Sequence, residues 1–298
     1  MNLKNERKMK RIKSILWVSA WAWLGLSCTQ NTLPEAPEPE PWQVTVSRAD
    51  TGTDDPTYNR ILILGQKSGT DASVRGILSV NGTTGTWEGT TPTWPTDNNG
   101  QDVALDVYAF SPVPEGDALP QAVDLTTGEG TAWQMDYQSD ATRPTEFTMT
   151  HLLAKLVVHV RIDGEVNPQP TDGSIRLYAK GEIDYPGKKV TTTEQAEVPL
   201  GIFHQEGQDE HSTEHNWEME TAIVVIPQEI PAGEPCLWFT AYGRTYTFTP
   251  QTRLKLEAGV VNNLYLGVAV DGPVLLEGIT VTDWETAPYI NGGEAEEE

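Results

Sequence analysis

Cysteine is scarce in this chain, which has only Cys28 and Cys236 among its 298 residues. Two cysteines give neither a disulfide framework nor the paired ligands of a cysteine-based zinc site. Cys236 begins the apolar run Cys236-Leu237-Trp238-Phe239, which predicts that it serves as a small buried hydrophobic side chain. Disulfide scaffolds and cysteine-based metal centres are therefore excluded.

Basic residues are also few, with 20 Lys and Arg against 43 Asp and Glu, for a net charge of −23. Six of the basic residues and a single acid, Glu6, lie in residues 1–27, which leaves residues 28–298 with 14 basic and 42 acidic side chains, a net −28. An acidic excess of this size repels nucleic acid and anionic lipid head groups and favours solubility. We expect no nucleic-acid partner.

Long apolar segments are absent as well. The longest, residues 15–26, has 12 residues, whereas a membrane-spanning α-helix needs about 20. A cationic head stands directly before it, made of Lys4, Arg7, Lys8, Lys10, Arg11 and Lys13. This layout is typical of a signal peptide, so residues 1–27 are predicted to be an export signal and not a permanent membrane anchor.

The end of the signal, Leu24-Gly25-Leu26-Ser27-Cys28, resembles the lipobox of bacterial lipoproteins, where a small residue precedes an obligatory cysteine. Gly25 departs from the pattern, because leucine is usual at that position. The resemblance implies a lipid on Cys28 that anchors the protein in the outer membrane, and an ordinary secretory signal is the alternative. Residues 28–41 continue as a Pro- and Glu-rich stretch, which predicts an extended spacer.

From residue 42 onward, the hydrophobic pattern has a period of two. Leu156, Val158, Val160 and Ile162 alternate with other side chains, and further apolar runs lie at residues 61–64, 77–80, 103–107, 175–179, 222–226, 246–248, 254–256, 264–270 and 279–281. Alternation of this kind is typical of half-buried strands, and no convincing amphipathic helix accompanies it. Asn81-Gly82, placed between two such runs, predicts a β-hairpin.

Many short strands with frequent turns predict an all-β fold of the sandwich or barrel class. The roughly 255 residues after the spacer exceed one typical sandwich, which favours two β-sandwich domains, residues 42–145 and residues 146–298. The predicted seam is the strand-poor stretch 128–146, with the second domain opening near Phe147.

No motif in the chain carries recognisable catalytic chemistry. A G-x-S-x-G nucleophile motif is absent, and His151 is expected to be a structural histidine at the start of a strand. The chain is therefore predicted not to be an enzyme and to need no metal or cofactor. Two polar clusters match no metal-ligand spacing and are expected to be solvated loops: Asp50, Asp54 and Asp55, and His204, His211 and His215.

Seven tryptophans follow the predicted signal. Trp238 and Trp284 have apolar or patterned neighbours and are predicted to lie in the core. Trp87, Trp94 and Trp133 stand in polar, Gly- and Thr-rich surroundings, so we expect them to be exposed and able to stack on sugar rings. This pattern favours an alternative function, that of a non-polymerising surface lipoprotein that binds glycans or host ligands.

Five segments follow one another in a set order: Trp94-Pro95-Thr96-Asp97, Leu105-Asp106-Val107-Tyr108-Ala109-Phe110-Ser111-Pro112, Phe147-Thr148-Met149-Thr150-His151-Leu152-Leu153-Ala154-Lys155-Leu156, Leu256-Glu257-Ala258-Gly259 and Ile279-Thr280-Val281-Thr282-Asp283-Trp284. Behind a lipoprotein signal, this order resembles the fimbrillin family, the Mfa-like pilins and accessory lipoproteins of type V pili. The resemblance implies two transthyretin-like β-sandwich domains, export to the cell surface, and a role in fimbria assembly or adhesion with other subunits or further copies. It implies no catalysis.

The resemblance also implies proteolytic processing. In polymerising members of the family, a trypsin-like protease cuts after an arginine near the N-terminus, and a strand donated by the next subunit fills the groove left by the lost first strand. Here a short strand pattern ends at Arg48, ahead of a polar loop with Gly and Pro, so Arg48 is the first candidate site and Arg60 the second. The alternative is that Arg48 only balances nearby acids. The tail after Trp284 ends in glutamates and makes a poor strand, which favours an anchor, tip or accessory subunit.

Overall fold

The computed structural model describes residues 42–48, 59–163, 170–205, 216–269 and 274–283. These residues form nineteen β-strands and the short 3-10 helix Glu115–Asp117, and no α-helix occurs among them. Within the same ranges, no helix is long and apolar enough to cross a membrane. The predicted all-β class is confirmed, whereas the transthyretin-like type of sandwich stays a prediction.

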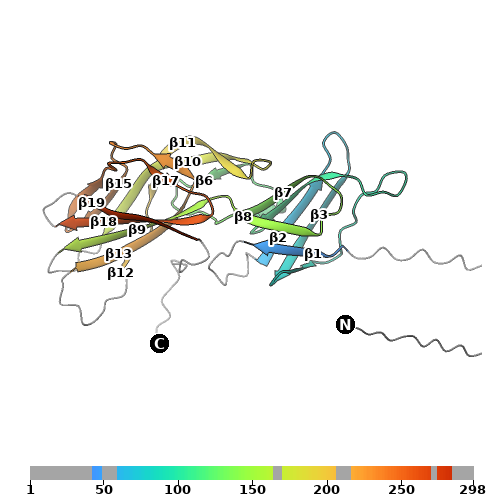
Figure 1. The fold of residues 1–298 in the computed structure, drawn as a ribbon, viewed down its shortest axis with the longest axis horizontal. Helices are drawn as coiled ribbons and strands as arrows, with labels where there is room; N and C mark the ends of the chain where they lie inside the picture. Colours follow the sequence, from blue (N-terminus) through green and yellow to red (C-terminus); the bar gives the residue numbers. More distant parts are fainter. Residues whose placement is uncertain (1–41, 49–58, 164–169, 206–215, 270–273, 284–298) are drawn as a thin grey trace, which may run out of the picture. The chain divides into compact units, whose positions relative to one another are not determined.

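Seven strands of the first half close into a barrel, drawn in blue to green in Figure 1. Their order is β1-β4-β3-β2-β5-β7-β8, and β8 returns to β1. Neighbouring strands are antiparallel except for β1 and β8, which are parallel. The strands are β1 Val44–Arg48, β2 Arg60–Gln66, β3 Ser73–Asn81, β4 Thr84–Trp87, β5 Leu105–Ser111, β7 Gln134–Ala141 and β8 Glu146–His151.

The remaining strands form two five-stranded sheets and a small two-stranded sheet. We call the first the β10 sheet, with the order β11-β10-β15-β16 and β6 paired to β10, and the second the β9 sheet, with the order β12-β13-β9-β18-β19. Strands β14 and β17 pair with each other. The bounds are β6 Ala122–Asp124, β9 Ala154–Asp163, β10 Thr171–Asp184, β11 Lys189–Pro199, β12 His204–Gln205, β13 Asn216–Val225, β14 Gln228–Ile230, β15 Leu237–Ala241, β16 Arg244–Phe248, β17 Leu254–Leu256, β18 Val260–Ala269 and β19 Val274–Asp283.

Strand β9 shows how the sequence pattern builds the core of this second half. Leu156, Val158, Val160 and Ile162 are 0–2% exposed, and they share one hydrophobic cluster with side chains of the β10 sheet. His159 and Arg161 lie on the opposite face, which is partly open. The alternation predicted for this strand is confirmed, and it separates a core face of the β9 sheet from an outer face.

The predicted hairpin at residues 77–87 is present as β3 and β4. Asn81 and Thr84 form the last paired residues, so the two-residue loop consists of Gly82 and Thr83, one position later than the Asn-Gly dipeptide suggested. Gly82 has a φ of +62°, a backbone conformation that a residue with a Cβ adopts at a cost.

The predicted seam differs from the structure in one respect. Residues 128–146 were expected to be poor in strands, yet they contain β7, and Phe147 lies in β8, which pairs with β1 and β7. Phe147 is fully buried in the barrel core. The hydrophobic pattern does not predict β7, because its inward residues include the buried polar side chains Gln134 and Asp136. The division at residues 145 and 146 stays a prediction.

Candidate functional site

Strand β1 completes the barrel between β4 and β8. The Thr45 N–H donates to the Thr145 carbonyl at 2.8 Å, and the Val46 N–H donates to the Thr83 carbonyl at 2.9 Å. Val44 and Val46 are 2% and 1% exposed, and both belong to the barrel core. The strand is thus bonded along both edges and buried along one face, although it is only five residues long.

Trp42 fixes the beginning of β1. Its Nε1–H donates to the Pro144 carbonyl at 2.6 Å, and its own carbonyl accepts from Trp87 Nε1 at 2.7 Å. The Trp42 ring lies 4.6 Å from that of Trp87 and meets Trp94 edge-on at 5.1 Å. Such ring pairs stabilise beyond the area they bury. We call Trp42, Trp87 and Trp94 the Trp42 cluster.

The Trp42 cluster corrects one expectation. Trp94 was predicted to be exposed, but it is 3% exposed, because its ring packs on Trp42 and its Nε1–H donates to the Val103 carbonyl at 2.9 Å. Trp87 is half-buried in the same cluster, whereas the half-buried Trp133 packs elsewhere, with its ring 5.5 Å from Phe110. Trp94 therefore has no open face for a sugar, and glycan stacking on Trp87 and Trp133 stays a prediction.

The two candidate cleavage sites, Arg48 and Arg60, differ in their structural surroundings. Arg48 is the last residue of β1, and the polar loop that follows it, residues 49–58, lies outside the described residues. Arg60 begins β2, and its guanidinium forms two hydrogen bonds of 2.8 Å with the Glu88 carboxylate. Ile61, directly after Arg60, is fully buried, so a protease would have to unfold β2 to cut there. Cys28 lies outside the described residues, and its lipidation stays a prediction.

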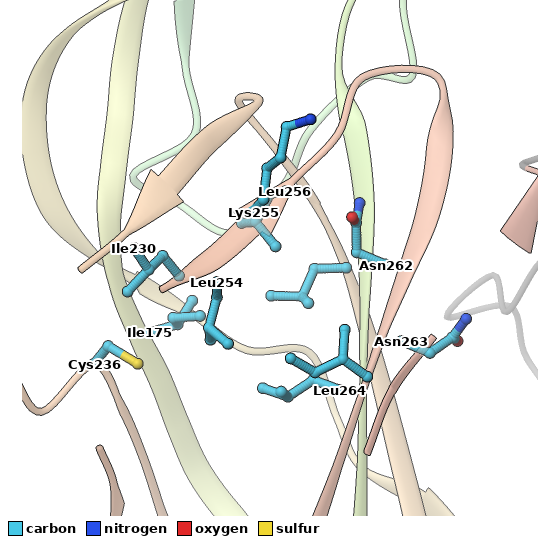
Figure 2. Close-up of a pocket in the computed structure, with 11 residues that line it drawn as sticks. Ile175, Ile230, Cys236, Leu254, Lys255, Leu256, Asn262, Asn263 and Leu264 are labelled. Carbon is cyan, nitrogen blue, oxygen red and sulfur yellow. The ribbon is translucent and has the colours of Figure 1, made fainter. Parts of the chain in front are cut away.

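A second feature is an apolar pocket in the second half, shown in Figure 2. It is a small hollow of about 20 Å³ with mostly aliphatic walls, which come from both large sheets and from the β14–β17 pair. Lys255 lines its rim and directs its ammonium group away from the apolar side chains. A 2.9 Å hydrogen bond to Glu257 raises the pKa of Lys255, whose side chain is 65% exposed. Ile279 and Val281 of β19 are 45% and 49% exposed, and Ile279 also lines the hollow.

The pocket offers apolar contact and little chemistry. Asn262 is the buried polar residue in its wall, and its amide is already engaged: Oδ1 accepts from the Glu257 N–H at 3.1 Å, and Nδ2 donates to the Lys155 carbonyl at 3.2 Å. Cys236 is 3% exposed within the core cluster, which confirms the prediction of a buried hydrophobic role. A site of this kind suits an apolar side chain and lacks the convergent polar groups of a catalytic centre.

The Cys236 thiol is expected to resist Ellman's reagent in the folded protein and to react fully on unfolding. Burial raises the pKa of this thiol to about 12, and the thiolate is the reactive species. The measurement compares a Cys28→Ser chain with and without guanidinium at mildly alkaline pH. Rapid reaction without denaturant would show that the pocket opens to small reagents, against the tight burial described above.

The polar clusters considered as metal sites fall largely outside the described residues. His204 is exposed in β12, while the other two histidines and the three aspartates of the predicted loops lie outside the described ranges. Within those ranges, no three His, Cys, Asp or Glu side chains gather in a way that could hold a metal ion. His151 ends β8 instead of starting a strand, and its Nε2 lies 3.2 Å from Gln134 Nε2.

Trp238 and Trp284, the two tryptophans predicted to lie in the core, differ in outcome. Trp238 in β15 is half-buried, so its predicted place in the core holds only in part. Trp284 lies outside the described residues.

Comparison with solved structures shows which known folds this chain resembles. Two solved structures share its fold. The first is a candidate cell adhesion protein from Bacteroides uniformis, with 16% identity and a TM-score of 0.57 over 82% of this chain and 99% of that one. The second is a candidate cell adhesion protein from Bacteroides ovatus, with 14% identity and a TM-score of 0.56 over 82% of this chain and 98% of that one. The tip fimbrial protein Mfa3 from Porphyromonas gingivalis aligns at 12% identity and a TM-score of 0.44, over 81% of this chain and all of the other. At these identities, the likeness to the two Bacteroides structures shows the fold alone. No curated protein matches the chain.

The family model described as "Fimbrillin-like" matches residues 47–284, from the end of β1 to just beyond β19. The match covers well over half of the chain and includes all five segments on which the resemblance was drawn. The chain therefore belongs to the fimbrillin-like family.

Proposed function

We propose that the protein is a structural or accessory subunit of a cell-surface fimbria, exported as an outer-membrane lipoprotein through Cys28. The single observation that carries this proposal is the seating of β1, a short terminal strand that closes the barrel by pairing on both edges. Family membership supports the same direction, because the fimbrillin-like family is a family of fimbrial proteins.

Assembly would depend on losing that strand. A cut after Arg48 would separate β1 from the barrel and leave the edges of β4 and β8 without a partner. Removal of the Val44 and Val46 side chains would leave an apolar groove beside Phe147. A strand from another subunit would restore the backbone hydrogen bonds and refill the apolar positions, since strand addition combines main-chain pairing with alternating side-chain pockets. Other fimbrial subunits, or copies of this chain, are the proposed partners.

The expected result of limited trypsin treatment is a first product that begins at Ala49. Arg48 ends its strand next to a polar loop, while Arg60 is tied to Glu88 and precedes a buried residue. Mass spectrometry and size-exclusion chromatography of residues 29–298 would follow both the cut and any assembly. Arg48→Gln is expected to block both, and the matched Arg60→Gln variant is expected to block neither. Oligomers that form equally well from Arg48→Gln would contradict the proposal.

A second candidate is a surface lipoprotein that stays anchored and binds a glycan or host ligand without polymerising. The sequence after Trp284 favours it, because its last seven residues, 292–298, hold two glycines and four glutamates and make a poor donor strand. This candidate predicts that the first tryptic product stays monomeric. A monomeric product is also compatible with an anchor, tip or accessory subunit of a fimbria.

A further inference from the structure

The outer face of the β9 sheet carries an aromatic pair in register across three strands. On β18, Leu264 and Leu266 belong to the core, so Tyr265 between them points to the outer face. Tyr265 pairs with His159 of β9 on one side and with Gly278 of β19 on the other. The three positions lie in one row that runs across the sheet to its edge strand.

The first side of Tyr265 is covered. The His159 ring stacks on it with centroids 4.4 Å apart and planes 10° from parallel. His159 is itself held by two neighbours: its Nδ1 lies 3.4 Å from Glu220 Oε2, and its Nε2 lies 3.2 Å from Asn263 Oδ1. The tyrosine ring is therefore pre-positioned, which lowers the entropy lost when something binds against it.

The second side of Tyr265 is open because its neighbour on β19 is a glycine. A Cβ placed on Gly278 would meet only Tyr265 Cδ2, at 3.8 Å, which is ordinary contact distance. Strand β19 is also the last strand in the order of its sheet. The position above Gly278 is thus open on the side of the tyrosine ring, and we call this open space the slot.

A fixed polar pair stands next to this slot. The β18–β19 pairing shifts register between Tyr265 and Leu266, and Glu277 lies at this shift. Its carboxylate crosses Gly267, where any Cβ would collide with it, and accepts a hydrogen bond from Arg161 Nη2. Glycine at position 267 is what allows this pair to form across β18.

The polar pair and the aromatic ring border one hollow. Arg161, Glu218, Glu277, His159 and Tyr265 line an open hollow of about 100 Å³ on this face. The Arg161 side chain is 41% exposed, so its guanidinium group reaches solvent beside the hollow. The hollow therefore combines an apolar ring face with carboxylate acceptors and a guanidinium donor, all held on strands instead of loops.

We propose that this face binds a neutral pyranose ring, which stacks in the slot between Tyr265 and Gly278 while its hydroxyl groups bond to Arg161 and Glu277. A sugar ring presents C–H groups on its face and hydroxyls at its rim, which matches an aromatic wall beside fixed donors and acceptors. The carboxylates of Glu218, Glu220 and Glu277 outnumber the cationic groups and repel anionic sugars. A simple cation fits less well, because Arg161 already neutralises Glu277 and would face it.

The test uses saturation-transfer NMR on residues 29–298 with the methyl glycosides of glucose, galactose and mannose as probes. Transfer to the ring C–H protons of at least one of them is the expected result. Gly278→Val fills the slot, and we expect it to weaken binding roughly tenfold or more. The same substitution suits a strand better than glycine does, so the melting temperature is expected to hold or rise. Loss of binding in this variant would thus not reflect unfolding.

Two substitutions of Tyr265 test whether its aromatic ring is needed for binding. Tyr265→Phe keeps the ring and is expected to retain binding, whereas Tyr265→Ala is expected to lose it. The matched control is Thr245→Val, a similar change at an exposed position of the edge strand β16, which is expected to leave binding unchanged. The inference is overturned if no glycoside shows transfer, or if transfer survives Gly278→Val. Binding of tetramethylammonium in place of every glycoside, abolished by Gly278→Val, would also overturn it and assign the slot to cations.

Discussion

A chain shortened to begin at Ala49 is expected to melt at a much lower temperature than the chain with β1, and to recover when a synthetic peptide of residues 42–48 is added. Trp42, Val44 and Val46 are 5%, 2% and 1% exposed in the barrel core. Burying each such side chain contributes about 1.5–3 kcal/mol. Their loss therefore removes a large part of the few kcal/mol by which a domain of this size is stable, and a peptide that binds the open barrel stabilises it by mass action.

The control for this experiment is a peptide of the same length with Val44→Asp and Val46→Asp. It keeps the backbone groups that pair with β4 and β8, but it would place two carboxylates in an apolar groove. Only the unmodified peptide is expected to raise the melting temperature, with a dependence on peptide concentration. Equal recovery with both peptides, or a shortened chain that melts with the parent, would show that β1 is not a seated and replaceable strand.

The second large effect is expected at Asp136, a β7 residue whose side chain is 5% exposed. Its Oδ1 accepts from the Tyr137 N–H at 2.8 Å and from Lys188 Nζ at 2.5 Å. Its Oδ2 accepts from the Thr148 N–H at 3.0 Å and from Gln138 Nε2 at 3.2 Å. Lys188 lies in the turn between β10 and β11, so this carboxylate joins two barrel strands to the second half of the chain.

Asp136→Ala is expected to lower the free energy of unfolding by about 3–5 kcal/mol, because it leaves buried donors without their acceptor. Urea denaturation followed by tryptophan fluorescence measures this loss. The matched control is Lys180→Ala, which breaks more exposed ion pairs with Asp124 and Glu194 at 3.7 and 3.4 Å. We expect that change to cost less than about 1 kcal/mol. Similar losses for the two variants would contradict the role given to the buried carboxylate.

The sequence predicted those strands in which apolar and polar residues alternate. Strand β9 is the clearest case, since Leu156, Val158, Val160 and Ile162 face the core as expected. Strand β7 was missed because it buries Gln134 and Asp136, and a pattern based on hydrophobicity does not register buried polar side chains. The closure of the barrel was also beyond reach, because β1 and β8 are about 100 residues apart and no local signal encodes a parallel pairing.

For the candidate sites too, the sequence predicts some features and not others. A strand pattern ending at Arg48 was visible in the sequence, and β1 ends there. The exposure of Trp94 was not predictable from its polar neighbours, because its burial depends on Trp42, a residue far from it along the chain. The slot at Tyr265 was missed for a related reason: the alternation around it is plain, but only the strand register places His159 on one side and Gly278 on the other.

The N-terminal mass of the protein recovered from the cell surface tests the central claim most directly, since β1 can be replaced by a partner's strand only after it has been removed. Assembled protein is expected to begin at Ala49 and to carry no lipid, while unassembled protein is expected to retain acylated Cys28. Assembled protein that still begins at an acylated Cys28, with residues 42–48 intact, would contradict it.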